Sequence, residues 1–189
     1  RAKVAAREVS VSFSESWSIF CKGNHAVRRL LAVGLGTMAF TMEDILLEPY
    51  GGEILNMSVG ATTSRTATLA IGGLLGFGLA SHVLGKGYDA FRMAMNGAFV
   101  GLPAFLAVIL AAPLGSPTLF AVGILLIGFG SGLFGHGTLT ATMRLAPKKQ
   151  SGLALGAWGA VQATAAGTAI ALGGVIRDLA SPLAGAAGG

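Results

Sequence analysis

Charged residues are scarce in this sequence, and acidic residues are the scarcest of them. Charged side chains make up 11% of the 189 residues, with eight Asp and Glu against thirteen Lys and Arg. An ordinary soluble domain carries roughly 25%. So few charges cannot cover a soluble protein of which 53% is hydrophobic and whose mean hydropathy is +0.71. The shortage excludes an ordinary soluble domain and indicates an integral membrane protein.

Cysteine and the common catalytic motifs are also lacking. The single cysteine, Cys21, excludes an internal disulfide framework. The sequence has no HExxH zinc motif, no nucleophile elbow and no nucleotide-binding loop, so we expect no enzyme activity. The basic residues form short clusters between apolar runs rather than a stripe, so we expect no nucleic-acid partner.

Long apolar runs dominate what is present. A transmembrane helix needs about 20 mostly apolar residues. Five segments meet this requirement: 28–47, 64–84, 92–112, 118–143 and 153–176. They predict an all-α, polytopic membrane helical bundle over residues 28–189. Residues 1–27 are polar and basic, and their aromatic cluster predicts either a short interfacial helix or a simple lead into the first span.

The basic residues predict how the bundle is oriented. Eleven of the thirteen lie in the N-terminal stretch or in the second and fourth connections, all on one side. Only Arg65 and Arg177 lie on the other side. Because cytoplasmic loops carry an excess of Lys and Arg, we expect the first side to be cytoplasmic.

Small residues at four-residue intervals predict helix contacts, because they let backbones approach closely in lipid. Three sets occur: Gly72 with Gly76, Gly128 with Gly132, and Gly152 with Gly156 and Ala160.

Three carboxylates lie in or beside the first apolar run. Glu43 and Asp44 are neighbours, and Glu48 follows one turn after Asp44. Ionisable residues inside a membrane are expensive and often mark a pathway or a site. One interpretation is therefore an intramembrane polar site for a proton, an ion or a pigment magnesium. The other is a structural charge pair with Arg65, which opens the next span on the same side, and we expect Arg65 near Asp44 or Glu48.

His136 is the other candidate site residue, in the stretch GLFGHGTLTATMRLAP. A neutral imidazole can ligate the magnesium of a chlorin pigment, and Gly135 and Gly137 would leave room for a flat ring. The competing interpretation is a histidine that is hydrogen-bonded to a neighbouring helix. No free metal ion is expected.

Four stretches together resemble the PucC-like family of phototrophic bacteria, which includes the LhaA proteins. They are TMAFTMEDILLEPYGGEIL, GFGLASHVLGKGYDAFRMA, GSGLFGHGTLTATMRLAP and GLALGAWGAVQATAAGTAIALGG, and the resemblance runs from about Ala39 to Asp178. That family in turn resembles the major facilitator superfamily, whose members have twelve helices in two halves. The resemblance implies that residues 1–27 are the central cytoplasmic loop and that the five spans are helices seven to eleven.

The resemblance also implies a function. It suggests a multi-pass protein of the bacterial inner, intracytoplasmic photosynthetic membrane that assists assembly of light-harvesting complexes. The implied partners are antenna polypeptides, the reaction centre–antenna complex and membrane lipid, and the implied cargo is bacteriochlorophyll. Two alternatives stay open: a proton-coupled transporter of a small solute, and a purely structural membrane subunit.

Overall fold

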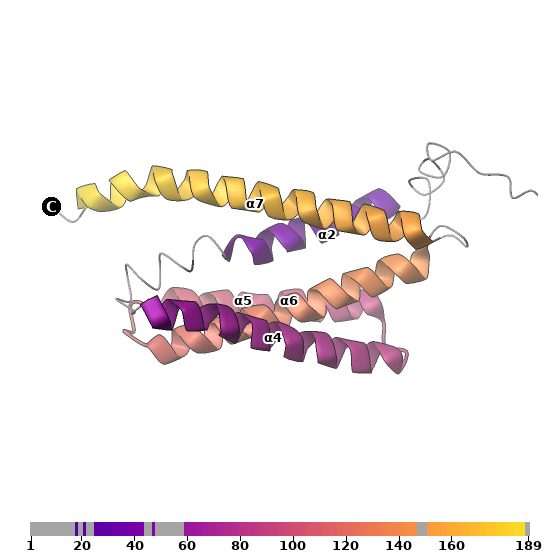
Figure 1. Cartoon of the computed structure of the whole chain (residues 1–189), viewed down its shortest axis with the longest axis horizontal. Helices are drawn as coiled ribbons and strands as arrows, with labels where there is room; N and C mark the ends of the chain where they lie inside the picture. Colours follow the sequence, from indigo (N-terminus) through magenta and orange to yellow (C-terminus); the bar gives the residue numbers. More distant parts are fainter. Residues whose placement is uncertain are drawn as a thin grey trace, which may run out of the picture.

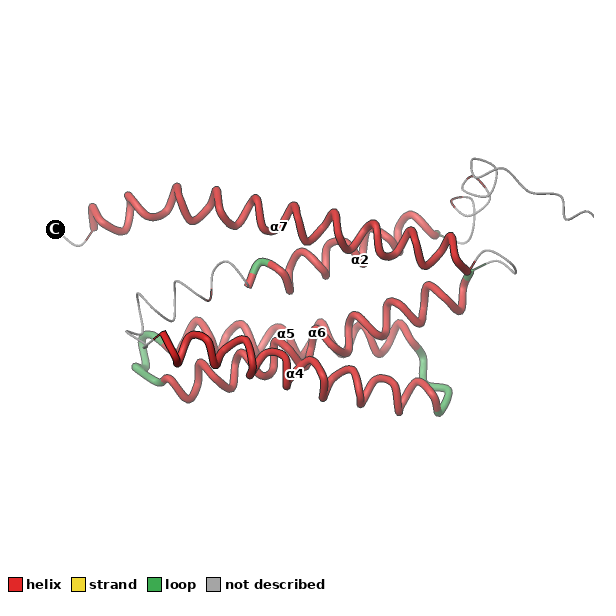
Figure 2. Tube along the Cα trace, viewed as in Figure 1, coloured by secondary structure: helices red, strands yellow, loops and turns green. Residues whose placement is uncertain are grey.

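The computed structural model describes residues 25–43, 59–146 and 151–187 together with Ser18, Cys21 and Leu47, the side chains at 59, 61, 62 and 180–187 excepted. Its regular structure, within these residues, is entirely helical (Figure 2). The helices are α2 (Ala26–Thr41), α4 (Val59–Gly85), α5 (Ala90–Ala111), α6 (Pro117–Leu145) and α7 (Ser151–Ala187). The predicted all-α class is confirmed.

Four of the five predicted spans are confirmed as helices that are long and apolar enough to cross a membrane. They cover Thr63–Gly85, Ala90–Ala111, Pro117–Leu145 and Ser151–Leu179. The first predicted span forms α2, whose 16 residues would reach only about 24 Å at the usual helical rise. Glu43 and Leu47 are also helical, and the rest of 28–47 lies outside the described residues.

Two helices extend at one end by five residues or more beyond the span that the apolar pattern predicted. Helix α4 begins at Val59 instead of residue 64, and α7 continues to Ala187 instead of ending at 176. The pattern missed these ends because polar and charged residues stop a hydrophobic run without stopping a helix. Arg177, for example, belongs to a residue type with a favourable helix propensity.

Consecutive helices alternate in direction, and they lie in two groups (Figure 1). Helices α4, α5 and α6 form a packed trio, while α2 lies along α7. Helix α6 contacts all four of the others, so it connects the pair to the trio.

Backbone contact at glycine holds the trio together. Each glycine of the first two predicted sets would drive an added Cβ into a backbone carbonyl of the facing helix: Gly72 into Leu125, Gly76 into Phe129, Gly128 into Leu69 and Gly132 into Gly73. The predicted role of these two sets is confirmed, and they define the α4–α6 seam. Gly97 and Gly137 approach α6 and α5 in the same way on the other side of the trio.

The third small-residue set does not make the predicted contact. A Cβ at Gly152 or Gly156 would meet nothing within 4 Å. Helix α7 packs instead through alanines on its opposite face, including Ala154 and Ala169, both fully buried. The prediction was wrong for the described residues because spacing identifies a flat helix face without naming what lies against it.

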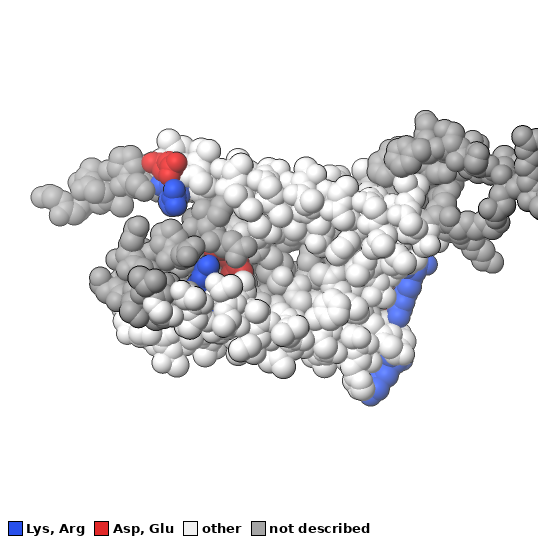
Figure 3. Space-filling model, viewed as in Figure 1, with Lys and Arg blue, Asp and Glu red and all other residues white. Residues whose placement is uncertain are grey.

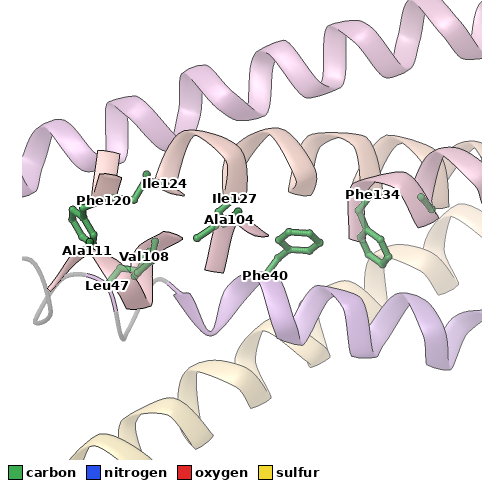
Figure 4. Close-up of a cluster of buried hydrophobic side chains, with 10 residues drawn as sticks. Phe40, Leu47, Ala104, Val108, Ala111, Phe120, Ile124, Ile127 and Phe134 are labelled. Carbon is green, nitrogen blue, oxygen red and sulfur yellow. The ribbon is translucent and has the colours of Figure 1, made fainter. Parts of the chain in front are cut away.

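Large apolar side chains fill the space between α2 and the trio (Figure 4). Phe40 of α2 points toward Phe134 of α6, with ring centroids 5.7 Å apart. Further along the cluster, Leu47 lies near Val108, Ala111 and Phe120. This cluster fixes the position of α2 against α5 and α6.

Most described basic residues lie at one end of the bundle (Figure 3). Because the helices alternate in direction, the start of α2, the loop after α4 and the end of α6 meet there, bringing Arg28, Arg29, Lys86, Arg92 and Arg144 to what we call the basic end. Arg65 and Arg177 belong to the opposite end. The fold thus groups the residues from which orientation was predicted, and the cytoplasmic assignment of that end stays a prediction. The predicted segment 1–27 lies almost wholly outside the described residues.

Candidate functional site

The loop after α4, in the stretch GKGYDAFR, is held by hydrogen bonds from both sides. The Asp89 carboxylate caps α5 by accepting from the Arg92 backbone N–H at 2.8 Å. Arg144 at the end of α6 donates to the carbonyl oxygens of Leu84 at 3.0 Å and Tyr88 at 3.1 Å. Arg144 therefore adds a second hydrogen bond to the Leu84 carbonyl in the last turn of α4, which also accepts from the Gly87 backbone N–H at 3.1 Å.

His136 lies on α6 beside α4, where its imidazole meets the ring of Phe77 edge-on, with centroids 4.2 Å apart. The side chain is half-buried. Its Nδ1 atom is buried and has no hydrogen-bond partner in the described part of the chain. His136 thus contacts the neighbouring helix through an aromatic ring, whereas the competing interpretation expected a hydrogen bond.

The two glycines beside His136 have different surroundings. A Cβ at Gly135 would meet nothing within 4 Å, whereas a Cβ at Gly137 would lie 2.6 Å from the Ala94 backbone nitrogen. Gly137 therefore serves the contact between α5 and α6. Only Gly135 leaves open space of the kind a flat ring requires.

The histidine meets one condition for a pigment ligand and lacks another. Burial of Nδ1 leaves Nε2 as the nitrogen that can face a ligand, which would put the proton on Nδ1. Ligating histidines usually donate that second N–H to an acceptor that orients the ring. Among the described residues, the imidazole contacts the ring of Phe77, and no hydrogen-bond acceptor lies within reach of Nδ1.

The buried charges of the bundle lie at the end opposite the basic end. Glu43 and Arg65 are only 5% and 8% exposed, so both side chains are withdrawn from lipid and water. Arg177 and Asp178 form an exposed ion pair at this end, 3.2 Å apart, and acidic and basic surfaces adjoin there in the space-filling view (Figure 3). Asp44 and Glu48 lie outside the described residues, so the predicted proximity of Arg65 to either of them stays a prediction.

A groove at the basic end was not predicted from the sequence. It has a volume of about 480 Å³ and lies between α2, α5 and α6. Arg28 and Arg29 line it from α2, Phe91 and Met95 from α5, and Thr138 from α6, among others. The sequence gave no signal for the groove, because its walls come from three separated segments and its arginines are indistinguishable from topology signals.

Thr138 also connects the groove wall to α7. The indole Nε1–H of Trp158 donates to the Thr138 hydroxyl oxygen at 3.3 Å, and that hydroxyl donates to the Gly135 carbonyl at 3.1 Å. Residues 136 and 138 point about 200° apart on a helix. The groove and His136 therefore occupy opposite sides of α6.

Comparison with known proteins settles the family. A family model described as PUCC protein matches residues 1–189, the full chain. The chain belongs to the PucC family. Membership agrees with the resemblance carried by the four stretches, and the helices identify this PucC-family chain as a multi-pass membrane protein.

The relatives include proteins of photosynthetic bacteria. The chain is 56% identical to Protein PucC of Cereibacter sphaeroides over 179 residues, covering 95% of this chain and 39% of that protein. It is 59% identical to Protein PucC of Rhodovulum sulfidophilum over 167 residues, covering 88% and 37%. It is 30% identical over 151 residues to a Rhodobacter capsulatus protein named Bacteriochlorophyll synthase 44.5 kDa chain, covering 77% and 35%.

The matches leave most of each relative uncovered. This chain spans less than two fifths of the length of those three proteins. No solved structure matches it significantly. A site that also needs residues from the uncovered part of a PucC-family protein is therefore described above only as far as this chain forms it.

Proposed function

We propose that this chain is part of a non-enzymatic assembly factor for light-harvesting complexes, which binds antenna polypeptides and delivers bacteriochlorophyll to them. Membership of the PucC family, with relatives in photosynthetic bacteria, supports the photosynthetic setting. The proposed location is the intracytoplasmic photosynthetic membrane. The reaction centre–antenna complex is then a further partner.

The open face of α7 is the structural observation that supports antenna binding. Gly152, Gly156, Gly159, Gly167 and Gly174 all have open space where a Cβ would lie. At about 100° per residue they fall within an arc of about 80°, opposite the buried alanines that pack toward α2. A flat glycine face permits close approach of another helix backbone in lipid, which suits a single-span antenna helix.

Bacteriochlorophyll would be the cargo, and His136 is the candidate ligand of its magnesium. The open space beside Gly135 supports this role, and because Nδ1 is buried, Nε2 is the nitrogen that would meet the ligand. Phe77 would supply an aromatic surface beside the pigment. The exposed apolar side chains nearby on α4, such as Leu74 and Phe77, suit a pigment better than a polar solute.

A proton-coupled transporter is the competing function, and buried Glu43 and Arg65 favour it. Transporters of the major facilitator superfamily, which the PucC-like family resembles, place ion and substrate sites near the membrane midplane on several helices. The described middles of α4, α5 and α6 carry mainly Gly, Ala, Leu and Phe. This lining supports the assembly role over transport of a sugar or an ion.

Deleting the gene in its phototrophic host tests the function as a whole. We expect the deletion to lower the antenna absorption of the membranes, while antenna transcripts stay at wild-type levels. Normal antenna levels accompanied by the loss of uptake of a solute would refute the proposal and favour the transporter.

Photocrosslinking tests the α7 face in the full-length protein. A photoreactive residue at Gly156 should form an adduct with an antenna polypeptide, whereas one at Phe99, an exposed position of α5, should not. An adduct only within the protein itself would mean that another of its own helices covers this face, and would refute antenna docking there.

The pigment role of His136 has its own test. His136→Phe should lower the bacteriochlorophyll that copurifies with the protein, because an aromatic ring is kept while the nitrogen ligand is removed. His82→Phe is the matched control, since His82 is exposed near the end of α4. Equal pigment content in the two variants would refute ligation by His136 while leaving antenna binding intact.

A further inference from the structure

We propose that the groove at the basic end binds one anionic phospholipid from the adjoining membrane leaflet, with its phosphate at Arg28 and Arg29 and an acyl chain between α2, α5 and α6. This inference is independent of the assembly role, because it depends only on the shape and charge of the groove.

The polar chemistry of the groove is confined to one end. Its lining includes two arginines and no acidic residue, so its charge is positive. Neither arginine takes part in an ion pair with another described residue. Both come from the first turn of α2, at the end where Lys86, Arg92 and Arg144 also lie. An anionic group is therefore the complement of this end.

Arg29 is already positioned for such a group. Its guanidinium carbon lies over the ring of Phe91, 5.4 Å from the ring centroid. A guanidinium that lies over an aromatic face keeps its N–H edge available for oxygen ligands, and its planar fork matches the geometry of a phosphate. Arg28 is exposed beside it and supplies a second set of donors.

The rest of the groove wall is apolar. Ala32 and Val33, Ala94 and Ala98, Phe134 and Ala141 line it below the arginines. The two threonines in the wall make hydrogen bonds inside α6: Thr138 donates to the Gly135 carbonyl at 3.1 Å, and Thr142 to the Thr138 carbonyl at 2.8 Å. Their hydroxyl protons are thus engaged, and the wall offers a ligand mainly hydrocarbon contact.

The dimensions of the groove favour a lipid over other ligands with an anionic group. On α6 the lining runs from Phe134 to Thr142, which is about 12 Å at the helical rise and covers most of one leaflet of a hydrocarbon core about 30 Å thick. A free phosphate would leave this apolar length empty. A magnesium pigment would find no His, Cys, Asp or Glu ligand in the lining.

The location of the groove agrees with where anionic lipid accumulates. Basic pockets between transmembrane helices on the cytoplasmic side are typical sites for anionic headgroups. The basic end is the end predicted to face the cytoplasm, so the groove would open to the leaflet that supplies such lipids.

The test measures retained lipid by native mass spectrometry on the purified full-length protein. The protein is taken from nanodiscs that contain phosphatidylglycerol and phosphatidylcholine in equal amounts. We expect one phosphatidylglycerol to stay bound to the wild type. Each arginine near the surface contributes roughly a fivefold factor in anionic-lipid binding, so Arg28→Gln with Arg29→Gln should lower its affinity about thirtyfold.

Two further variants separate the groove from general surface attraction. Arg92→Gln removes an exposed charge at the same end that does not line the groove, and it should leave binding unchanged. Ala98→Phe fills an exposed part of the wall without changing charge, and it should displace the lipid. If the double variant does not fold, Arg28→Gln alone should still show the fivefold loss.

Three results would overturn the proposal. The first is wild-type retention of phosphatidylglycerol by the double arginine variant. The second is an equal loss in Arg92→Gln, which would show that the charged end attracts the lipid without a specific site. The third is unchanged binding in Ala98→Phe, which would place the lipid outside the groove.

Discussion

Replacement of Gly76 by alanine should push α4 and α6 apart. A Cβ at Gly76 would overlap the backbone carbonyl of Phe129, and a helical carbonyl cannot rotate away as a flexible side chain can. The same added methyl at Gly78, two positions along α4, would meet nothing within 4 Å. The pair therefore compares an identical chemical change at a closed and an open position of one helix.

The size of the effect follows from two opposing contributions. Gly→Ala improves helix propensity by about 0.8–1.0 kcal/mol, and this gain is common to both variants. Overpacking a closely fitted contact costs about 1–3 kcal/mol, and this cost applies only to Gly76→Ala. We therefore expect Gly76→Ala to be less stable than Gly78→Ala by about 1–3 kcal/mol.

Reversible unfolding in mixed detergent micelles measures this difference. The edge-on contact between Phe77 and His136 lies beside Gly76 on the same seam, so the imidazole NMR signals of His136 should shift in Gly76→Ala and stay in place in Gly78→Ala. Equal stability of the two variants would refute close backbone contact at the α4–α6 seam.

Three other predictions concern the loop after α4, the start of α5 and the orientation of the bundle. Arg144→Ala should speed amide hydrogen exchange around residues 84–88 and lower the free energy of unfolding by about 1–2 kcal/mol, because two charge-assisted hydrogen bonds are lost at an exposed position. Unchanged exchange there would show that Arg144 does not hold this loop. Asp89→Ala should lower the free energy of unfolding by about 0.5–2 kcal/mol, because it removes the N-cap of α5, and Asp89→Asn should keep most of that stability. Thermal unfolding measures both variants. Wild-type stability of Asp89→Ala would refute the capping role. With Cys21 changed to Ser, Lys86→Cys should resist an impermeant thiol reagent applied to intact cells while Leu114→Cys reacts, and the reverse pattern would invert the predicted orientation.

Helix existence was predictable because it depends on the length of apolar runs, which the sequence shows directly. Helix ends were less so, since Arg177 and Asp178 interrupt hydropathy while α7 continues through them. The glycines of the α4–α6 seam and those of α7 have the same spacing. Of these two sets, among the described residues, only the seam glycines lie against the backbone of another helix. A local pattern describes one surface, and the partner of that surface depends on the whole arrangement.

The candidate sites show the same limit. His136 was identifiable as a histidine in an apolar run, but its contact with Phe77 comes from α4, some sixty residues away. Arg28 and Arg29 were counted only as orientation signals, because their meeting with Phe91 and Thr138 depends on how three helices pack. A single residue with binding chemistry could be identified from the sequence, whereas a site built from several helices could not.

The two kinds of helix contact in this bundle differ in how much sliding they permit. Where a backbone carbonyl lies against glycine, as that of Phe129 does at Gly76, the contact cannot adjust by rotating a side chain, so we expect α4 and α6 to move together. Between α2 and the trio the contact is made by rings such as Phe40 and Phe134, which can adjust by side-chain rotation as a backbone carbonyl cannot. Any change of shape during a working cycle should therefore be a rocking of α2 and α7 over a rigid base, with the Trp158–Thr138 hydrogen bond as the latch between them.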